Sequence, residues 1–283
     1  MTGTDSPSPK IMGILNVSAE SFFKKSIALT QEAIAKRAIE LEQLGANIVD
    51  IGAMSTAPYL DTVIPVEEES QRMKLGIKTV QESCNLPVSV DTPRAEVAKI
   101  AIDYGVDFIN DVTGLKYDDQ MGPTISKADT SAILGAYVYG LGHSGDIDET
   151  IKALEESLTI ARNSSIDEDR ITIDPSIGFF RKDGKSPFYS RITECEWYER
   201  DLQIISNLES LSKLSKPVCV SLSNKSFIGK LLNLQIEDRL IPSIVYEIIC
   251  VLKGADIIRT HNVRETNIAI KAFKSIKKNI SAI

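Results

Sequence analysis

Short apolar runs alternate along the chain with longer segments in which apolar residues recur every three or four positions. The apolar runs are continuous, which is typical of parallel strands covered on both faces. The predicted strands are residues 11–17, 47–52, 87–91, 108–112, 131–139, 171–174, 217–221 and 256–262. The predicted helices are residues 27–44, 66–82, 94–104, 119–128, 148–163, 192–214, 240–253 and 263–277.

These elements form eight strand–helix units that follow one another about every 30 residues, the spacing expected of a βα repeat. Eight such units predict an α/β fold, a (β/α)8 TIM barrel in a single domain. A doubly wound sheet is the alternative fold, and it is disfavoured because no G-x-G-x-x-G motif follows the first strand. We expect a polar N-terminal leader over residues 1–10 and the barrel over residues 11–283.

Composition narrows the class of protein. Of the 283 residues, 43% are hydrophobic and 25% are charged, which suits a soluble globular protein. The formal charge of −7 argues against a general nucleic-acid binder. Four cysteines without a C-x-x-C pair make a zinc site or a disulfide framework improbable, and they suit a reducing compartment. Without a signal peptide or a long apolar run, we expect a cytoplasmic protein with no membrane partner. Apolar surfaces on the sixth and seventh predicted helices favour a homodimer.

Polar residues stand where the predicted strands end. They are Asn16, Asp50, Asp91, Asn110, Asp111, Asp174, Lys225, Arg259 and His261. Each one alone is most often a helix cap or a turn residue. In a TIM barrel, however, the C-terminal ends of the strands form the active site, so we expect these side chains to converge.

The mixture of these side chains indicates a kind of substrate. Aspartate and asparagine suit a flat, nitrogen-rich heterocycle, whose ring N–H groups and carbonyls they can pair with. Lys225, Arg259 and His261 supply the opposite charge for an anionic group such as phosphate or pyrophosphate. Asn16 is suited to holding Mg²⁺ together with substrate phosphates. With two histidines in the chain and no Ser-His-Asp pattern, nucleophilic triad chemistry is not expected.

Seven short motifs occur in the order found in dihydropteroate synthases, which this chain resembles from about residue 11 to residue 277. They are Met12-Gly13-Ile14-Leu15-Asn16-Val17 with Ser21-Phe22, Asp50-Ile51-Gly52 with Ser55-Thr56 and Pro58, Ser89-Val90-Asp91-Thr92, Ile109-Asn110-Asp111, Asp174-Pro175 with Ile177-Gly178-Phe179, Ser223 with Lys225-Ser226-Phe227-Ile228-Gly229, and Arg259-Thr260-His261. Several motifs in one order are a far stronger signal than any of them alone.

The resemblance implies a transferase of folate biosynthesis. Members of that family join 6-hydroxymethyl-7,8-dihydropterin pyrophosphate to p-aminobenzoate and release pyrophosphate. The residues implied to bind the pterin are Asp91, Asn110, Asp174, Lys225 and Asn224, of which Asp91, Asp174 and Lys225 are the candidate catalytic residues. Those implied to bind pyrophosphate are Asn16, Arg259 and His261, with Mg²⁺ bridging at Asn16. Those implied to bind the second substrate are Ser55, Thr56, Phe179, Arg181 and Ser226.

The chain departs from the family pattern mainly in two loops. Residues 18–26 lack the two glycines and the second aspartate of the usual Thr-Pro-Asp-Ser-Phe-Ser-Asp-Gly-Gly. In the next loop Ala57 replaces the usual arginine and Tyr59 the usual glycine, and Asn224 replaces another arginine. The usual Met-His after the fifth strand is absent. The pterin and pyrophosphate half is therefore kept, whereas the second-substrate half is rebuilt.

Three functions fit this pattern. The first is a synthase that uses p-aminobenzoate or, as in methanopterin biosynthesis, a ribosylated aminobenzene phosphate. The second is a pterin-dependent methyltransferase that passes a methyl group from a tetrahydropterin to a corrinoid protein; such enzymes often carry Leu-Ser-Asn in the seventh strand, as Leu222-Ser223-Asn224 does here. The third is a pterin-binding protein without catalysis. Lys225, Arg259 and His261 favour the synthase, since a methyltransferase has no pyrophosphate to hold.

Overall fold

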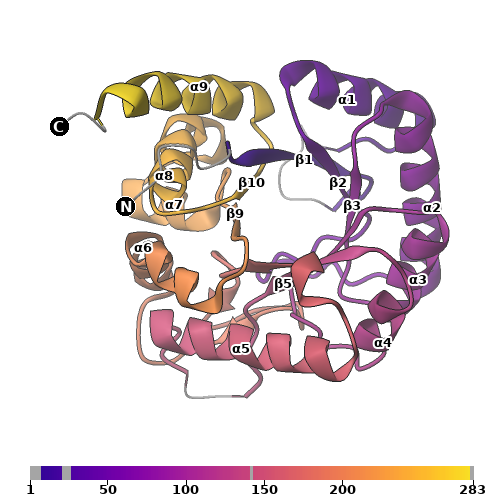
Figure 1. Cartoon of the computed structure of the whole chain (residues 1–283), viewed down its shortest axis with the longest axis horizontal. Helices are drawn as coiled ribbons and strands as arrows, with labels where there is room; N and C mark the ends of the chain where they lie inside the picture. The colour runs from indigo at the N-terminus through magenta and orange to yellow at the C-terminus, as the bar shows by residue number, and fades with distance from the viewer. Residues whose placement is uncertain (1–7, 21–26, 141–142, 281–283) are drawn as a thin grey trace.

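The fold is a barrel of eight parallel strands surrounded by helices (Figure 1), as seen in a computed structural model that describes residues 8–20, 27–140 and 143–280. The barrel strands are β1 (Lys10–Asn16), β2 (Ile48–Gly52), β3 (Val88–Asp91), β4 (Phe108–Asp111), β5 (Ser131–Gly135), β6 (Ile171–Asp174), β9 (Cys219–Ser221) and β10 (Ile257–Thr260). This architecture confirms the predicted single-domain (β/α)8 TIM barrel.

The sheet closes through the two ends of the chain. Its strand order is β6-β5-β4-β3-β2-β1-β10-β9, so the first strand pairs with the last. Four residue pairs join β1 to β10, from Lys10 with Ile257 to Gly13 with Thr260. Between β6 and β9 the barrel is joined by one isolated parallel bridge, Ile173 with Val218. The barrel is therefore closed by more strand pairing between β1 and β10 than between β6 and β9.

Helices cover the outside of this barrel. They are α1 (Gln31–Leu44), α2 (Val66–Ser83), α3 (Ala95–Asp103), α4 (Met121–Ser126), α5 (Ile147–Asn163), α6 (Trp197–Ser206), α7 (Ser226–Leu232), α8 (Leu240–Leu252) and α9 (Val263–Ile280). Helix α1 begins four residues later than predicted because Thr30 is its N-cap and accepts a hydrogen bond from the Ala33 N–H. It ends at Leu44, and its C-cap Gly45 has a φ of 92°, in the left-handed region that glycine adopts at helix ends.

The fifth predicted strand and the sixth predicted helix are also too long. The strand expected over residues 131–139 ends at Gly135, because Tyr137 and Val138 contact the long segment after β6 instead of a barrel strand: the Tyr137 hydroxyl donates to the Pro187 carbonyl and the Val138 N–H to Ser190 Oγ. The helix expected over residues 192–214 begins at Trp197 and gives way after Ser206 to a 3-10 segment, Leu208–Leu214.

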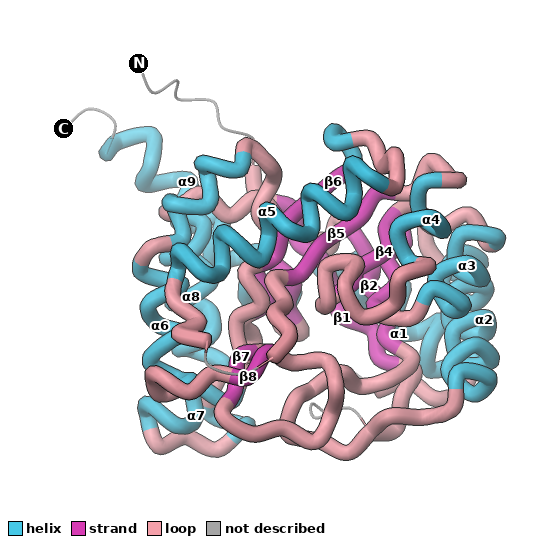
Figure 2. Tube along the Cα trace, turned by 90° about the horizontal axis from the view of Figure 1, so that it is seen from below, coloured by secondary structure: helices cyan, strands magenta, loops and turns pink. Residues whose placement is uncertain are grey.

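Two short elements were not predicted. A two-stranded parallel ribbon, β7 (Phe180–Arg181) with β8 (Ser190–Arg191), lies in the long segment after β6. Figure 2 shows this ribbon among the loops at one end of the barrel. Helix α7 follows β9 directly and precedes α8. Both elements lie on the segments that carry Arg181 and Ser226, so they shape the site described below.

The barrel interior is apolar toward its base. Met12, Ile48, Ile133, Cys219 and Ile257, contributed by five different strands, form one buried cluster. Such contacts are possible only across the inside of the barrel, which is a packed core and not a pore. A larger cluster fills the space between the strands and the helices. Among the described residues no helix is long and apolar enough to cross a membrane.

Candidate active site

A cleft of about 610 Å³, including its open mouth, lies at the C-terminal ends of the strands. A deeper cavity of about 360 Å³ adjoins it, and the two share Asp91, Phe179, Ser221, Lys225 and Arg259. The site residues on the outer cleft are Asn16, Ser55, Thr56, Asp91, Phe179, Arg181, Lys225, Ser226, Arg259 and His261. Asn110 and Asp174 line the deeper cavity. The structure therefore brings together twelve of the thirteen candidate site residues.

Arg259 lies at the junction of the two cavities and holds two carboxylates. Its Nε donates to Asp50 Oδ2 at 2.6 Å and its Nη2 to Asp91 Oδ2 at 2.7 Å, with a longer contact from Nη1 to Ser221 Oγ. Burial alone would lower the pKa of Arg259, but Asp50 and Asp91 raise it above its ordinary value. Arg259 is thus charged at every working pH, and it links β10 to β2 and β3.

Lys225 points into both cavities from the start of α7. Its Nζ lies 4.4 Å from the centre of the Phe179 ring, a cation–π contact. Burial, together with the charge of Arg259, lowers the pKa of Lys225 to about 8. A buried ammonium of this kind is a strong hydrogen-bond donor near neutral pH and is readily deprotonated above it.

Two carboxylates and an amide line the deeper cavity beside Lys225 and Arg259. Burial raises the pKa of Asp91 to about 7 and also raises the pKa of Asp174. Asp174 Oδ1 accepts a hydrogen bond from the Ser176 N–H at 2.7 Å, which fixes this carboxylate at the end of β6. Asn110 makes a long contact of 3.5 Å to Asp50. A ring that enters the cavity therefore meets two carboxylates that can accept hydrogen bonds and one amide that can both donate and accept them.

His261 contributes hydrogen bonding rather than charge. Its Nδ1 lies 2.7 Å from Ser223 Oγ, and its backbone N–H donates to the same oxygen at 3.0 Å. Burial, with Arg259, Lys225 and Arg37 nearby, lowers the pKa of His261 well below its usual range. The expectation that His261 would add positive charge is therefore wrong, since a neutral imidazole costs less in this buried cationic surrounding.

Three polar residues near the strand ends do not line the described cavities. Asp111 accepts hydrogen bonds from Thr113 and from the Leu115 N–H, so it organises its own loop. Asp50 is fully buried beneath Arg259. Asn224, a predicted pterin residue, is 2% exposed with a φ of 58° and belongs to neither cavity lining. The left-handed turn at this residue could not be seen in the sequence.

The outer part of the cleft has a cationic wall with aromatic neighbours. Arg181 Nη2 donates to Ser226 Oγ at 2.6 Å, and the guanidinium carbon lies 3.6 Å from the centre of the Trp197 ring. The centre of the Tyr59 ring, on the loop that departs from the family, lies 5.8 Å from the same guanidinium carbon. Sequence reasoning missed Tyr59 and Ser221 as lining residues. The replacement of a family glycine was the signal that pointed to Tyr59.

Part of the first family motif lies outside the described residues. Its Ser21 and Phe22 belong to segment 21–26. Among the described residues no three His, Cys, Asp or Glu side chains form a metal-binding group. The amide of Asn16 in the outer cleft is a hard oxygen ligand of the kind that Mg²⁺ accepts when substrate phosphates complete its shell.

Comparisons with known proteins agree with this geometry. The chain is 32% identical over 262 residues to a dihydropteroate synthase of Clostridium beijerinckii, with 92% of this chain and 91% of that one covered. It is 31% identical over 255 residues to the Bacillus subtilis dihydropteroate synthase, with 90% and 84% covered. The structure of a Coxiella burnetii dihydropteroate synthase in complex with pteroic acid superposes with a TM-score of 0.83 at 29% identity, covering 98% of this chain and 95% of that one.

The family relationship covers nearly the whole barrel. The family model described as pterin binding enzyme matches residues 12–261, which run from the first strand to the last. The match includes every strand-end residue discussed above. The resemblance to dihydropteroate synthases is confirmed, and the chain belongs to the pterin-binding enzyme family.

Proposed function

We propose that this protein is a dihydropteroate synthase that joins 6-hydroxymethyl-7,8-dihydropterin pyrophosphate to p-aminobenzoate. The observation that carries the proposal is the two-part cleft: two carboxylates and an amide line its deeper cavity beside Lys225 and Arg259, and the outer cleft adds a further cation, Arg181. Membership of the family and the relatives' names, with pteroic acid bound in the Coxiella burnetii structure, support the same reaction.

The pterin ring is placed in the deeper cavity. Asp91 and Asp174 accept hydrogen bonds from ring N–H groups, while the Asn110 amide and the Lys225 ammonium donate to ring acceptors. As pyrophosphate departs, positive charge builds up on the pterin methylene and its ring. The two carboxylates stabilise this charge because they are fixed in a largely water-excluded site.

The pyrophosphate is placed at Asn16, Arg259 and His261. Arg259 uses one N–H on each of its nitrogens for Asp50, Asp91 and Ser221, which leaves a second N–H on Nη1 and on Nη2 for an anion. The neutral His261 donates one hydrogen bond. Mg²⁺, which Asn16 would help to hold, neutralises charge on the departing group when it is bound.

The aminobenzoate is placed in the outer cleft. Phe179 offers an apolar ring face, and Arg181 with Ser226 offers donors for a carboxylate, while Ser55 and Thr56 line the opposite side. The bond from the pterin methylene carbon to the pyrophosphate oxygen breaks, the bond from that carbon to the amine nitrogen forms, and the amine gives a proton to water. Holding the amine beside the carbon supplies much of the rate enhancement.

A condensation assay tests this function. Purified protein with the pterin pyrophosphate, Mg²⁺ and p-aminobenzoate is expected to release pyrophosphate and form dihydropteroate, and to do so faster than with the ribosylated aminobenzene phosphate. Pyrophosphate with Mg²⁺ is expected to raise the melting temperature, because ligands that bind the folded state stabilise it. Stabilisation by methyl-tetrahydropterin alone would favour methyl transfer to a corrinoid protein. Pterin binding without turnover would leave a non-catalytic pterin-binding protein.

The rate should depend on pH through Asp91 and Lys225. We expect kcat/KM to rise as the pH rises through about 7, where Asp91 loses its proton and becomes an acceptor. It should fall above about 8, where Lys225 loses its proton and its charge. Steady-state rates across this range at constant ionic strength measure both limbs, and a flat profile through this range would contradict the assigned roles.

We further propose that the protein forms a homodimer. Helix α8 exposes Ile241, Val245 and Leu252 at 75%, 51% and 62%. Only Ser243, Glu247 and Cys250 of this helix are buried, so an unusually apolar face points outward. Sedimentation velocity should give twice the chain mass, and Ile241→Glu should give the single chain.

A further inference from the structure

Arg200 and Asp201 form a fully buried ion pair near the start of α6, with Arg200 Nη1 3.4 Å from Asp201 Oδ1. Neither residue lines the described cavities. A buried ion pair seldom stabilises a fold better than apolar side chains of the same volume would. Such a pair directly behind a candidate active site therefore calls for a functional explanation.

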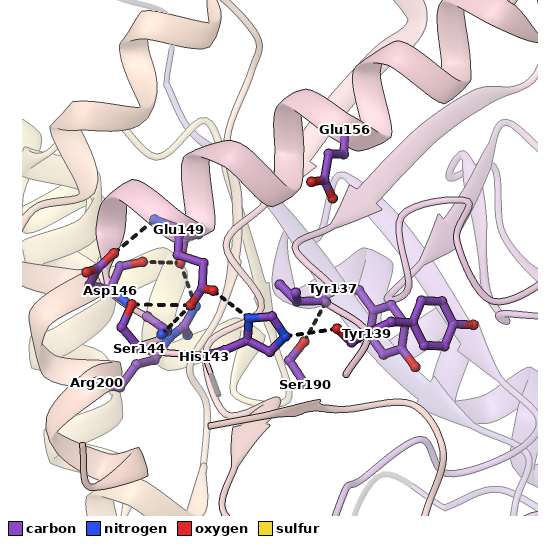
Figure 3. Close-up of polar contacts among 12 residues, drawn as sticks. Tyr137, Tyr139, His143, Ser144, Asp146, Glu149, Glu156, Ser190 and Arg200 are labelled. Atoms are coloured by element: carbon purple, nitrogen blue, oxygen red, sulfur yellow. Dashed lines mark hydrogen bonds and ion pairs between the residues drawn. The ribbon is translucent and has the colours of Figure 1, made fainter. Parts of the chain in front are cut away.

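Arg200 ties the loop after β6 to the start of α5. Its Nε donates to the Gly145 carbonyl at 2.8 Å, and its Nη2 donates to Thr150 Oγ1 at 2.9 Å and to the Pro175 carbonyl at 3.0 Å. The guanidinium carbon also lies 3.8 Å from the centre of the Phe180 ring. Figure 3 shows Arg200 beside Ser144 and Asp146, where α5 begins. Arg200 is thus held rigidly and fixes the position of its neighbour.

Asp201 acts on the turn that faces Lys225. Its Oδ1 accepts the Gly178 N–H at 2.9 Å, whereas its Oδ2 is buried without a hydrogen-bond partner. Gly178 has a φ of 86°, and a Cβ there would lie 3.0 Å from Lys225 Cδ. The next residue, Phe179, stacks on the Lys225 ammonium. The carboxylate of Asp201 therefore fixes the Gly178–Phe179 turn, which Lys225 contacts.

The charges around Lys225 come from five other elements or the loops beside them. The groups that interact with it electrostatically are Asp91, Asp174, Asp201, Arg181, Arg259 and His261. Asp91 is bound to Arg259, and Asp174 is held by a backbone N–H and is placed against the pterin. Asp201 is the carboxylate of this group that lies outside both described cavities, so no ligand in them displaces it from beside Lys225. Burial raises the pKa of Asp201, and the charges of Arg200 and Arg181 act against that rise and favour the carboxylate.

We propose that Asp201, anchored by Arg200, is a positioning residue: it fixes the Gly178–Phe179 turn against Lys225 and supplies the lasting negative charge behind the Lys225 ammonium. The proposal rests on the proposed function, because it assumes that Lys225 contacts the substrate in its protonated form. It adds residues of α6 to the machinery of the site without any contact between them and the substrate.

Asp201→Asn tests the proposal, since asparagine keeps the shape and the acceptor for Gly178 but removes the charge. We expect the alkaline limb of the kcat/KM profile to move to lower pH by about one unit. At pH values below the limb the rate should fall by less than about threefold, because the turn remains hydrogen-bonded. The matched control is Thr150→Val, which removes the hydrogen bonds of Thr150 Oγ1 with Arg200 and with the Asp146 carbonyl, changes no charge and should leave the limb in place.

A second measurement separates this inference from the proposed reaction. The rate at which an amine-reactive reagent labels Lys225 is followed against pH by mass spectrometry, without any substrate. Its midpoint should be lower in Asp201→Asn than in the natural chain or in Thr150→Val. If Asp201→Asn and the natural chain had equal midpoints, or if the variant lowered the labelling rate by the same factor at every pH, Asp201 would have only a structural role. If the protein had no synthase activity but Asp201→Asn still shifted the labelling midpoint, the proposed reaction would be refuted. The role of Asp201 beside Lys225 would still hold.

Discussion

Replacement of Arg259 by methionine is expected to lower the free energy of unfolding by about 3–5 kcal/mol, because it leaves two carboxylates facing each other in a buried place. Asp50 is fully buried, the Asp91 side chain is 14% exposed, and each gives one oxygen to this guanidinium. Pyrophosphate binding should be lost as well. Pterin binding should also weaken, since Asp91 loses the partner that fixes it. Urea denaturation and ligand titration measure these effects.

Two variants serve as controls for this result. Arg264→Met removes an arginine whose 3.8 Å ion pair with Glu265 is largely exposed, and it should change the stability by less than about 0.5 kcal/mol. The double variant Arg259→Met with Asp50→Asn should recover part of the stability, because one uncompensated charge is removed. If the double variant were less stable than Arg259→Met alone, buried charge would not be the cause.

The second large effect concerns the rate. Lys225→Met should lower kcat/KM by about 10²–10³-fold, because it removes a fixed charged donor from a largely water-excluded site. The fold should be retained, since methionine can keep the contact with Phe179 and the desolvation of an ammonium is avoided. Lys230→Met is the matched control on the same helix: Lys230 lies outside the described cavities, so the rate should stay unchanged. Equal losses in both variants would point to damage to α7.

The barrel could be predicted because its strands are buried on both faces. Residues 171–174 were predicted without error, since Arg170 precedes that run and Pro175, which has no N–H for a strand hydrogen bond, follows it. Residues 136–139 were wrongly added to β5, because Tyr137 is buried where its hydroxyl bonds to the Pro187 carbonyl of a loop far along the chain. Burial by a loop and burial by a neighbouring strand leave the same apolar pattern in a sequence.

The sequence predicted most of the residues that form the candidate site, but not their hydrogen-bond partners or their charges. Neighbouring Asn110 and Asp111 look alike in the sequence, yet one lines the deeper cavity and the other organises its own loop. The charge of His261 depends on buried cations from other elements, which no local pattern reports. The β7–β8 ribbon escaped prediction because strands of two residues show no periodicity.

The pairing of β1 with β10 has a consequence for the order in which the protein is made. The ribosome releases the first six barrel strands well before residues 257–260, so the nascent chain carries an open sheet until that last strand arrives. The same strand brings Arg259, the cation that Asp50 and Asp91 need. The arrival of β10 therefore closes the barrel and pairs its buried carboxylates with a cation in one late step of synthesis. A nascent chain that stalls before β10 has an open barrel and unpaired carboxylates.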